Sequence, residues 1–107
     1  MRPIRIYLSG PITGTDDYIE RFLAVEQKAK RSWNDIVNPA KIDKMLPKLT
    51  HEEYMSIDLA MLNLCDAILM MKGWEQSKGC RQEYEFAKEH QIMILGEEIE
   101  EEENESV

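Results

Sequence analysis

Short apolar runs alternate along this chain with longer stretches in which apolar residues recur every three or four positions. The short runs are typical of buried β-strands. They occupy residues 3–9, 35–38, 66–71 and 92–95. The longer stretches have the spacing of amphipathic α-helices. They occupy residues 16–33, residues 50–64 and the segment that starts at Ser77 or Lys78.

Turn and helix-capping residues support these boundaries. Gly10-Pro11 ends the first strand, and Asn38-Pro39 is a turn dipeptide that closes the second. Thr50 followed by Glu53 is a capping-box pattern at the start of a helix. Residues 40–49 have no clear period, so we expect an irregular connection or a single helical turn there.

Strand and helix alternate over residues 1–96, and this order predicts a parallel sheet with helices on both faces. We expect a single α/β domain of the Rossmann or flavodoxin-like kind, with the probable strand order 2-1-3-4. A chain of 107 residues is long enough for one hydrophobic core and too short for two domains. In such a sheet, ligands bind outside the carboxyl ends of the strands.

The net charge of -8 comes mostly from one segment. Residues 97–107 hold seven of the 21 acidic residues and no base, which leaves 14 acids against 13 bases elsewhere. The domain therefore has no basic surface that would bind duplex nucleic acid. The tail has little apolar surface to bury, so we expect residues 97–107 to be a disordered acidic tail.

The sequence also argues against a membrane and a metal site. No apolar run approaches the roughly 20 residues that cross a bilayer, and no signal-peptide core follows the N-terminus. We therefore expect a cytoplasmic protein. Cys65 and Cys80 lack the spacing and the histidine neighbours of a zinc site, which predicts two reduced thiols and no bound metal.

The turn after the first strand is a candidate ligand loop. Gly10, Pro11, Thr13 and Gly14 lie where backbone N–H groups can face a phosphate or a sugar. The loop lacks the G-x-G-x-x-G pattern and the lysine of a P-loop, so we expect no cofactor. An ordinary strand-to-helix turn is the alternative. Tyr7 precedes this loop, where its hydroxyl can reach the crevice.

The start of the last helix contains the strongest catalytic candidate. Ser77 can cap the helix, Gly79 permits close approach, and Glu83 lies on the same helical face as Gly79. A solvent-exposed acid is the alternative for Glu83. Glu85 lies about 160 degrees further round the helix and is expected to be solvated.

Two other residues, Asp58 and Trp74, have two possible roles each. Asp58 lies in an apolar stretch of the helix that starts near Thr50, so it is either on the solvent face or buried for a purpose. Trp74 is either a surface on which a base stacks or an anchor for its loop. Cys80 is read as small apolar filler, and Asp66 as structural.

Taken together, these residues resemble a known superfamily. The segments Tyr7-Leu8-Ser9-Gly10-Pro11, Asp58 and Ser77-x-Gly79-x-x-x-Glu83 resemble the nucleoside 2-deoxyribosyltransferases and the related 2'-deoxynucleoside 5'-phosphate N-hydrolases. The chain looks closest to a small branch of undefined function found in phages and prophages. The resemblance covers roughly residues 4–96.

The resemblance implies a role for each matching residue. Glu83 would be the nucleophile, Asp58 the acid/base carboxyl group, and Tyr7 the donor of a hydrogen bond to the nucleophile. Ser77 would match a serine that holds a 5'-phosphate in the hydrolases, whereas Pro11 resembles the loop of the transferases.

The expected function is cleavage or transfer of the N-glycosidic bond of a nucleoside or nucleotide through a covalent glycosyl-Glu83 intermediate. The alternative is a non-catalytic nucleotide-binding module of the same fold. The expected partner is a small-molecule nucleoside or nucleotide, and the resemblance also implies a homo-oligomer.

Overall fold

The computed structural model describes residues 3–12 and 14–97, which form an α/β domain. Thr13 and residues 98–107 lie outside the described residues, and with them nearly all of the predicted acidic tail. The elements follow in the order β1 (Arg5–Ser9), α1 (Tyr18–Ala29), β2 (Asp35–Val37), α2 (Pro39–Met45), α3 (His51–Leu62), β3 (Ala67–Met70), the short 3₁₀ helix η1 (Trp74–Gln76), α4 (Lys78–Glu89) and β4 (Met93–Gly96).

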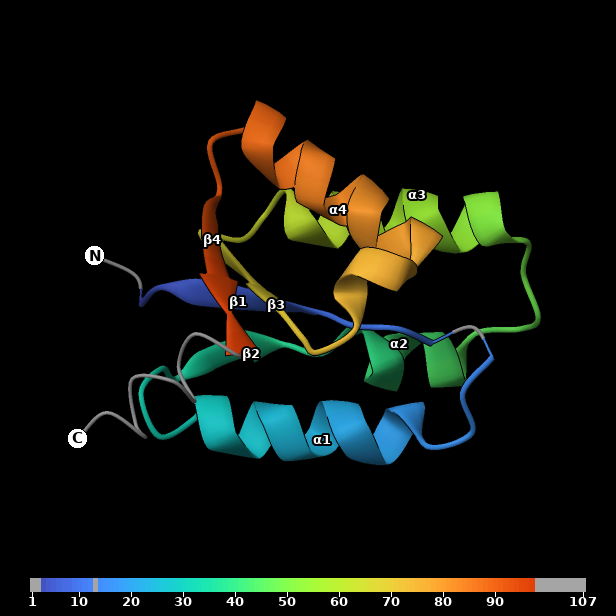
Figure 1. Ribbon diagram of the computed structural model, residues 1–107, viewed down its shortest axis with the longest axis horizontal. Helices are drawn as coiled ribbons and strands as arrows, with labels where there is room; N and C mark the ends of the chain where they lie inside the picture. Colours follow the sequence, from blue (N-terminus) through green and yellow to red (C-terminus); the bar gives the residue numbers. More distant parts are fainter. Residues whose placement is uncertain (1–2, 13, 98–107) are drawn as a thin grey trace.

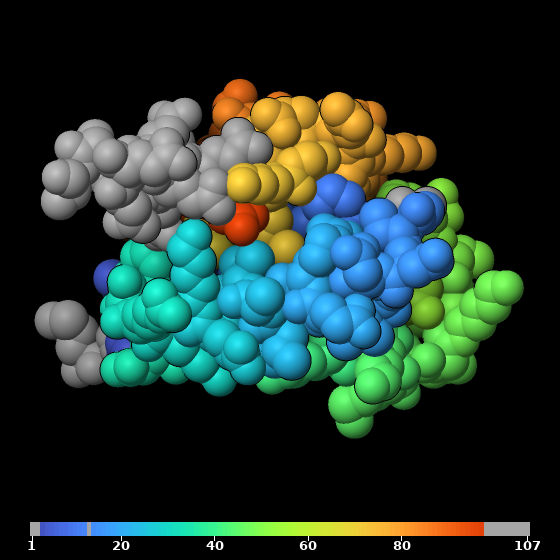
Figure 2. Space-filling model, turned by 60° about the horizontal axis from the view of Figure 1, so that its bottom comes forward, coloured from blue at the N-terminus to red at the C-terminus, as the bar shows by residue number. Residues whose placement is uncertain are grey.

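The four strands form one parallel sheet in the order β2-β1-β3-β4, which confirms the predicted fold and strand order. Helices α1 and α2 cover one face of the sheet, and α3 and α4 cover the other (Figure 1). The surface view in Figure 2 shows the side chains of α1 spread across the first of these faces. No helix in the described part of the chain is long and apolar enough to span a membrane.

Burial of both sheet faces explains the continuous apolar runs in β1 and β3. Alternate residues of a strand point to opposite faces. Ile6 and Leu8 therefore belong to the core under α1 and α2, whereas Tyr7 belongs to the core under α3 and α4. Tyr7 is 0% exposed and faces the helices that carry Asp58 and Glu83.

The second helix is longer than the sequence predicted. Residues Pro39–Met45 form α2 where an irregular connection or a single turn was expected. Pro39 is at the start of the helix, where its missing N–H costs nothing. The Asn38 side chain caps the helix by accepting a hydrogen bond from the Ala40 N–H at 3.0 Å. These start signals override the lack of a regular apolar period.

The other boundaries agree with the predicted elements to within a few residues. The capping box at α3 is present: Thr50 Oγ1 accepts from the Glu53 N–H at 3.2 Å, and the Thr50 N–H donates to Glu53 Oε1 at 2.8 Å. Asp66 is structural as predicted, because its Oδ2 accepts the Arg5 N–H at 2.9 Å. Gly73 adopts a φ of 84° before η1, a conformation that favours glycine.

A buried acid joins α1 to α2. Glu26 is 4% exposed and accepts a hydrogen bond from Asn38 Nδ2 at 2.9 Å. Lys30 Nζ and Lys41 Nζ lie 2.9 and 3.0 Å from its carboxylate. Burial alone would raise the pKa of Glu26, but the bonds from Asn38, Lys30 and Lys41 outweigh it and lower the pKa to about 2.

We predict that Glu26→Gln lowers the free energy of unfolding by about 2 kcal/mol at pH 7. The folded pKa lies below the ordinary value of 4.5, so the stabilisation is complete above pH 4.5 and is lost as the pH falls towards 2. Urea titrations at pH 7 and pH 3 measure the difference. Glu20→Gln, an exposed acid on α1, is the control. An equal loss for both variants, or a loss independent of pH, would contradict this account.

Candidate active site

A pocket of about 340 Å³ opens beside the carboxyl end of β1, between the helices of the two layers. Its volume is in the range of small-molecule sites. The wall includes residues from β1, α1, α2, α3 and α4. The predicted site residues that line it are Tyr7, Gly10, Asp58, Ser77, Gly79 and Glu83.

Glu83 is buried in the wall of this pocket and is held by two hydroxyl groups. It lies in the second turn of α4, and Ser77 caps that helix by accepting a hydrogen bond from the Cys80 N–H at 3.3 Å. Tyr7 Oη donates to Glu83 Oε2, and Ser9 Oγ donates to Oε1 at 2.6 Å. Glu83 is 6% exposed, so the reading as a solvent-exposed acid is wrong.

Two opposing effects set the charge of Glu83. Burial raises the pKa of this carboxyl group, the hydrogen bonds from Ser9 and Tyr7 lower it, and the result is about 7. Burial and the Glu83 charge both raise the pKa of Tyr7 well above 10, so the phenol keeps its proton and remains a donor. Glu83 is therefore poised to ionise near neutral pH.

Asp58 enters the same pocket from α3. It is 7% exposed, and its Oδ1 has no hydrogen-bond partner within the described residues. Burial, then the charge of Asp43 and then that of Glu83, raise the pKa of Asp58 to about 8. The buried reading of Asp58 is thus confirmed, and its carboxyl group holds a proton at pH 7.

A third carboxyl group, Asp43 of α2, also lines the pocket. Burial raises the pKa of Asp43 to about 6. Asp43 was not predicted as a site residue, because residues 40–49 show no clear period and were expected to form an irregular connection or a single helical turn. Ser9 was missed as well, although strand alternation places it on the same sheet face as Tyr7 and therefore beside Glu83.

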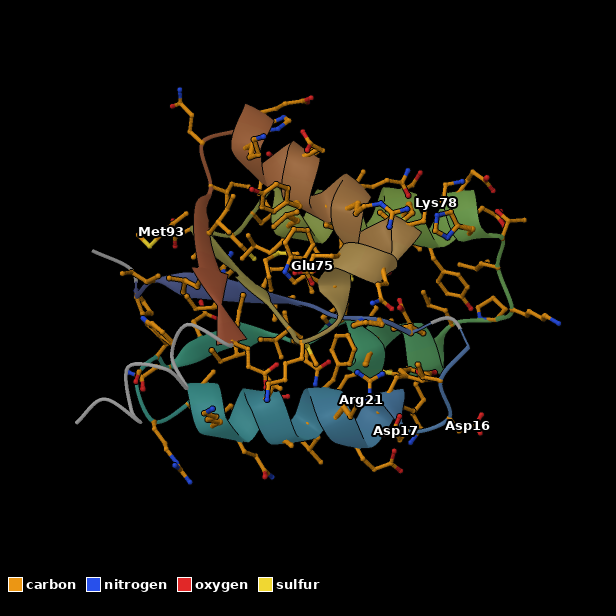
Figure 3. All side chains as sticks on the ribbon, in the orientation of Figure 1. Asp16, Asp17, Arg21, Glu75, Lys78 and Met93 are labelled. Carbon is orange, nitrogen blue, oxygen red and sulfur yellow. The ribbon has the colours of Figure 1, made fainter. Side chains whose placement is uncertain are left out.

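The loop after β1 is only partly in the site. Gly10 lines the pocket, and a Cβ there would lie 2.7 Å from Met71 Sδ, so the position requires glycine unless Met71 moves. Pro11 and Gly14 are not among the lining residues. Arg21 Nη2 donates to the Pro11 carbonyl at 2.7 Å. Arg21 Nε also bonds Asp17 at 3.1 Å, a pair labelled in Figure 3 at the start of α1.

Trp74 does not line the pocket. Its ring stacks on Tyr84 of α4, with centroids 4.7 Å apart and planes 23° apart. Of the two roles considered for Trp74, the loop anchor is the one that its position supports. Cys80 is 2% exposed, and burial raises its pKa, as expected for apolar filler.

Residues 4–96 of the chain match the model of a family described as a domain of unknown function, DUF4406. The chain belongs to this family. No curated protein matches the chain. The matched segment of the DUF4406 domain includes the three pocket carboxyl groups, Asp43, Asp58 and Glu83, and the two hydroxyl groups that bond Glu83, those of Tyr7 and Ser9.

Other polar groups complete the pocket of this DUF4406 domain. His51 is exposed and lines the pocket, with Nε2 3.0 Å from Gln82 Oε1. Tyr54 also lines the pocket and donates to the Pro47 carbonyl at 3.2 Å. Among the residues that the structure describes, no three His, Cys, Asp or Glu side chains form a group able to hold a metal ion.

The bond from Tyr7 to Glu83 leads to a prediction for this site. Tyr7→Phe removes one donor to the carboxylate, a loss of about 1–2 kcal/mol, so we expect the pKa of Glu83 to rise above 7 by about one unit. An NMR titration of the Glu83 carboxyl carbon measures this pKa. Tyr84→Phe, on α4 outside the pocket, is the control. An unchanged titration in Tyr7→Phe would show that Tyr7 does not tune Glu83.

Proposed function

We propose that this DUF4406 domain cleaves or transfers the N-glycosidic bond of a nucleoside or nucleotide, with Glu83 as nucleophile. The observation that carries the proposal is the arrangement around Glu83: a buried carboxyl group held by Tyr7 and Ser9 shares a pocket with the protonated Asp58. Two carboxyl groups with separate proton states supply the nucleophile and the acid that such a reaction requires.

In the first step, one Glu83 carboxylate oxygen bonds to C1' of the sugar while the C1'–N bond breaks. The electron pair of that bond leaves with the base, and the Asp58 proton moves to a base nitrogen. Tyr7 and Ser9 keep Glu83 oriented and spread its charge before attack. The products are a glycosyl ester on Glu83, a neutral base and ionised Asp58.

In the second step, ionised Asp58 takes a proton from water or from an acceptor base. The resulting nucleophile bonds to C1', and the ester bond to Glu83 breaks. Water as acceptor yields the free sugar, and a second base yields a new nucleoside. Both outcomes restore the Glu83 carboxylate and protonated Asp58, so the cycle needs no cofactor.

The pH dependence of the proposed reaction follows from the two carboxyl groups. Glu83 must be ionised and Asp58 must be protonated, so activity should rise as the pH passes 7 and fall as it passes 8. The pH–rate profile should therefore be bell-shaped. Because the two carboxyl groups interact, its two apparent pKa values are properties of the pair and not of either residue alone.

The test is release of free base from purified protein. Deoxynucleosides and their 5'-monophosphates are incubated with the wild type and with Glu83→Gln, and the products are separated by chromatography. The proposal expects free base, or a new nucleoside when a second base is added, from the wild type alone. Substrate that binds and is recovered intact would favour the non-catalytic binding module. The homo-oligomeric state and the cytoplasmic location remain predictions.

A further inference from the structure

Asp43 and Asp58 each bring a buried, unpaired oxygen to the pocket. Asp43 Oδ1 and Asp58 Oδ1 have no hydrogen-bond partner within the described residues. The two side chains come from different helices, α2 and α3, and both line the pocket wall. A buried polar atom without a partner costs on the order of 1–3 kcal/mol, so a ligand that supplies a donor here gains affinity.

Asp43 shares the pocket with both carboxyl groups of the proposed reaction, and its charge raises the pKa of Asp58 and also that of Glu83. After burial, the charge of Asp43 is the largest cause of the raised pKa of Asp58, ahead of the charge of Glu83. Both carboxylate oxygens of Glu83 are already bonded, to Tyr7 and Ser9, whereas Asp43 Oδ1 and Asp58 Oδ1 are unpaired within the described residues. A ligand in this pocket can therefore satisfy Asp58 and Asp43 together.

No lysine or arginine is among the described residues that line the pocket. The wall therefore offers no lysine or arginine to Asp43, and an N–H or O–H of the ligand can satisfy its unpaired oxygen. With a pKa of about 6, Asp43 is mainly ionised above pH 7 and can only accept hydrogen bonds. A carbonyl oxygen of the ligand at the same position would face the Asp43 carboxylate, and neither of these two acceptors could donate a hydrogen bond to the other.

We propose that Asp43 is a specificity-determining residue that selects bases carrying an exocyclic amino group beside a ring nitrogen. This inference rests on the proposed function for the assignment of Asp58 as the acid. Protonated Asp58 donates to the ring nitrogen, and the Asp43 carboxylate accepts from the neighbouring amino N–H. The pocket thereby discriminates adenine from hypoxanthine and cytosine from uracil, which place a carbonyl oxygen at that position.

The test compares matched nucleosides. We measure kcat/KM for 2'-deoxyadenosine against 2'-deoxyinosine, and for 2'-deoxycytidine against 2'-deoxyuridine, at pH 7.5. Wild type should prefer the amino member of at least one pair by about tenfold or more. Asp43→Asn should bring that ratio to within about threefold, because the amide can turn either its oxygen or its NH₂ towards the base. Asp16→Asn changes an exposed acid before α1 and should keep the wild-type ratio (Figure 3).

A calorimetric titration of the same four nucleosides separates this inference from the proposed function. Tighter binding of the amino members, lost in Asp43→Asn but without turnover by the wild type, would support the selection by Asp43 and reject the catalytic proposal. Turnover with equal rates for amino and oxo members would overturn the selection and leave the catalytic proposal standing. Equal binding together with no turnover would overturn both.

Discussion

Glu83→Gln is expected to lower kcat/KM by on the order of 10⁴-fold or more, because the amide cannot form the glycosyl ester. The fold should survive this change. Gln is close in size to Glu, its Oε1 can accept one of the two hydroxyl bonds, and the other hydroxyl can turn to accept from the amide NH₂. Activity is measured as base release.

Glu85→Gln is the matched control for this variant. Glu85 lies two residues further along α4, is exposed, and has Lys88 Nζ 4.0 Å from its carboxylate. The Glu85→Gln variant should keep wild-type activity. A Glu83→Gln variant that is folded by thermal denaturation and retains more than a tenth of wild-type activity would exclude Glu83 as the nucleophile.

Asp58→Asn is expected to slow release of poorly leaving bases by about 10²–10⁴-fold, the usual contribution of a positioned general acid. The loss should shrink for substrates whose base departs readily without a proton. The alkaline limb of the pH–rate profile, which follows the Asp58 pKa of about 8, should disappear, whereas the acidic limb set by Glu83 should remain. A uniform loss for all leaving groups would argue that Asp58 only positions the substrate.

Asp58→Asn should increase the stability of the fold although it lowers activity. The folded pKa of Asp58 lies above the ordinary value of 3.8, so the folded protein must hold a proton that the unfolded chain releases as the pH rises. Wild type therefore loses stability between about pH 4 and pH 8. Relative to wild type, Asp58→Asn should gain on the order of 3 kcal/mol across that interval. Urea titrations at both ends measure the gain, and a constant difference would contradict the raised pKa.

The fold was predictable because its elements carry strong local signals. β1 and β3 are buried on both faces and appear as continuous apolar runs, while α3 and α4 begin at side chains that cap them. Alternation of strands and helices then leaves few possible topologies. The full length of helix α2 was not predicted, because seven residues are too few to establish a period, although Asn38-Pro39 at its start is a helix-initiation signal.

The candidate site was predictable only in part. Helical spacing from Gly79 pointed to Glu83, and an acid within an apolar stretch pointed to Asp58. Sequence spacing carries no information on contacts between distant elements. The hydrogen bond from Tyr7 to Glu83, 76 residues away, was expected only from the family resemblance and is confirmed, whereas the bond from Ser9 was not expected. Trp74 was predicted as a possible binding residue and lies outside the pocket. The sequence alone cannot show whether an aromatic side chain on a loop stacks on a ligand or on another residue, here Tyr84.

The central claim is that Glu83 forms a covalent bond to the sugar. A 2'-fluoro-substituted nucleoside slows breakdown of such an ester, because fluorine destabilises the oxocarbenium-like transition state. Intact mass after incubation should show one added fluorosugar on the wild type and on Glu85→Gln, and none on Glu83→Gln. Peptide mapping should place it on Glu83. An adduct on Glu83→Gln, or base release by the wild type without any adduct, would contradict the account.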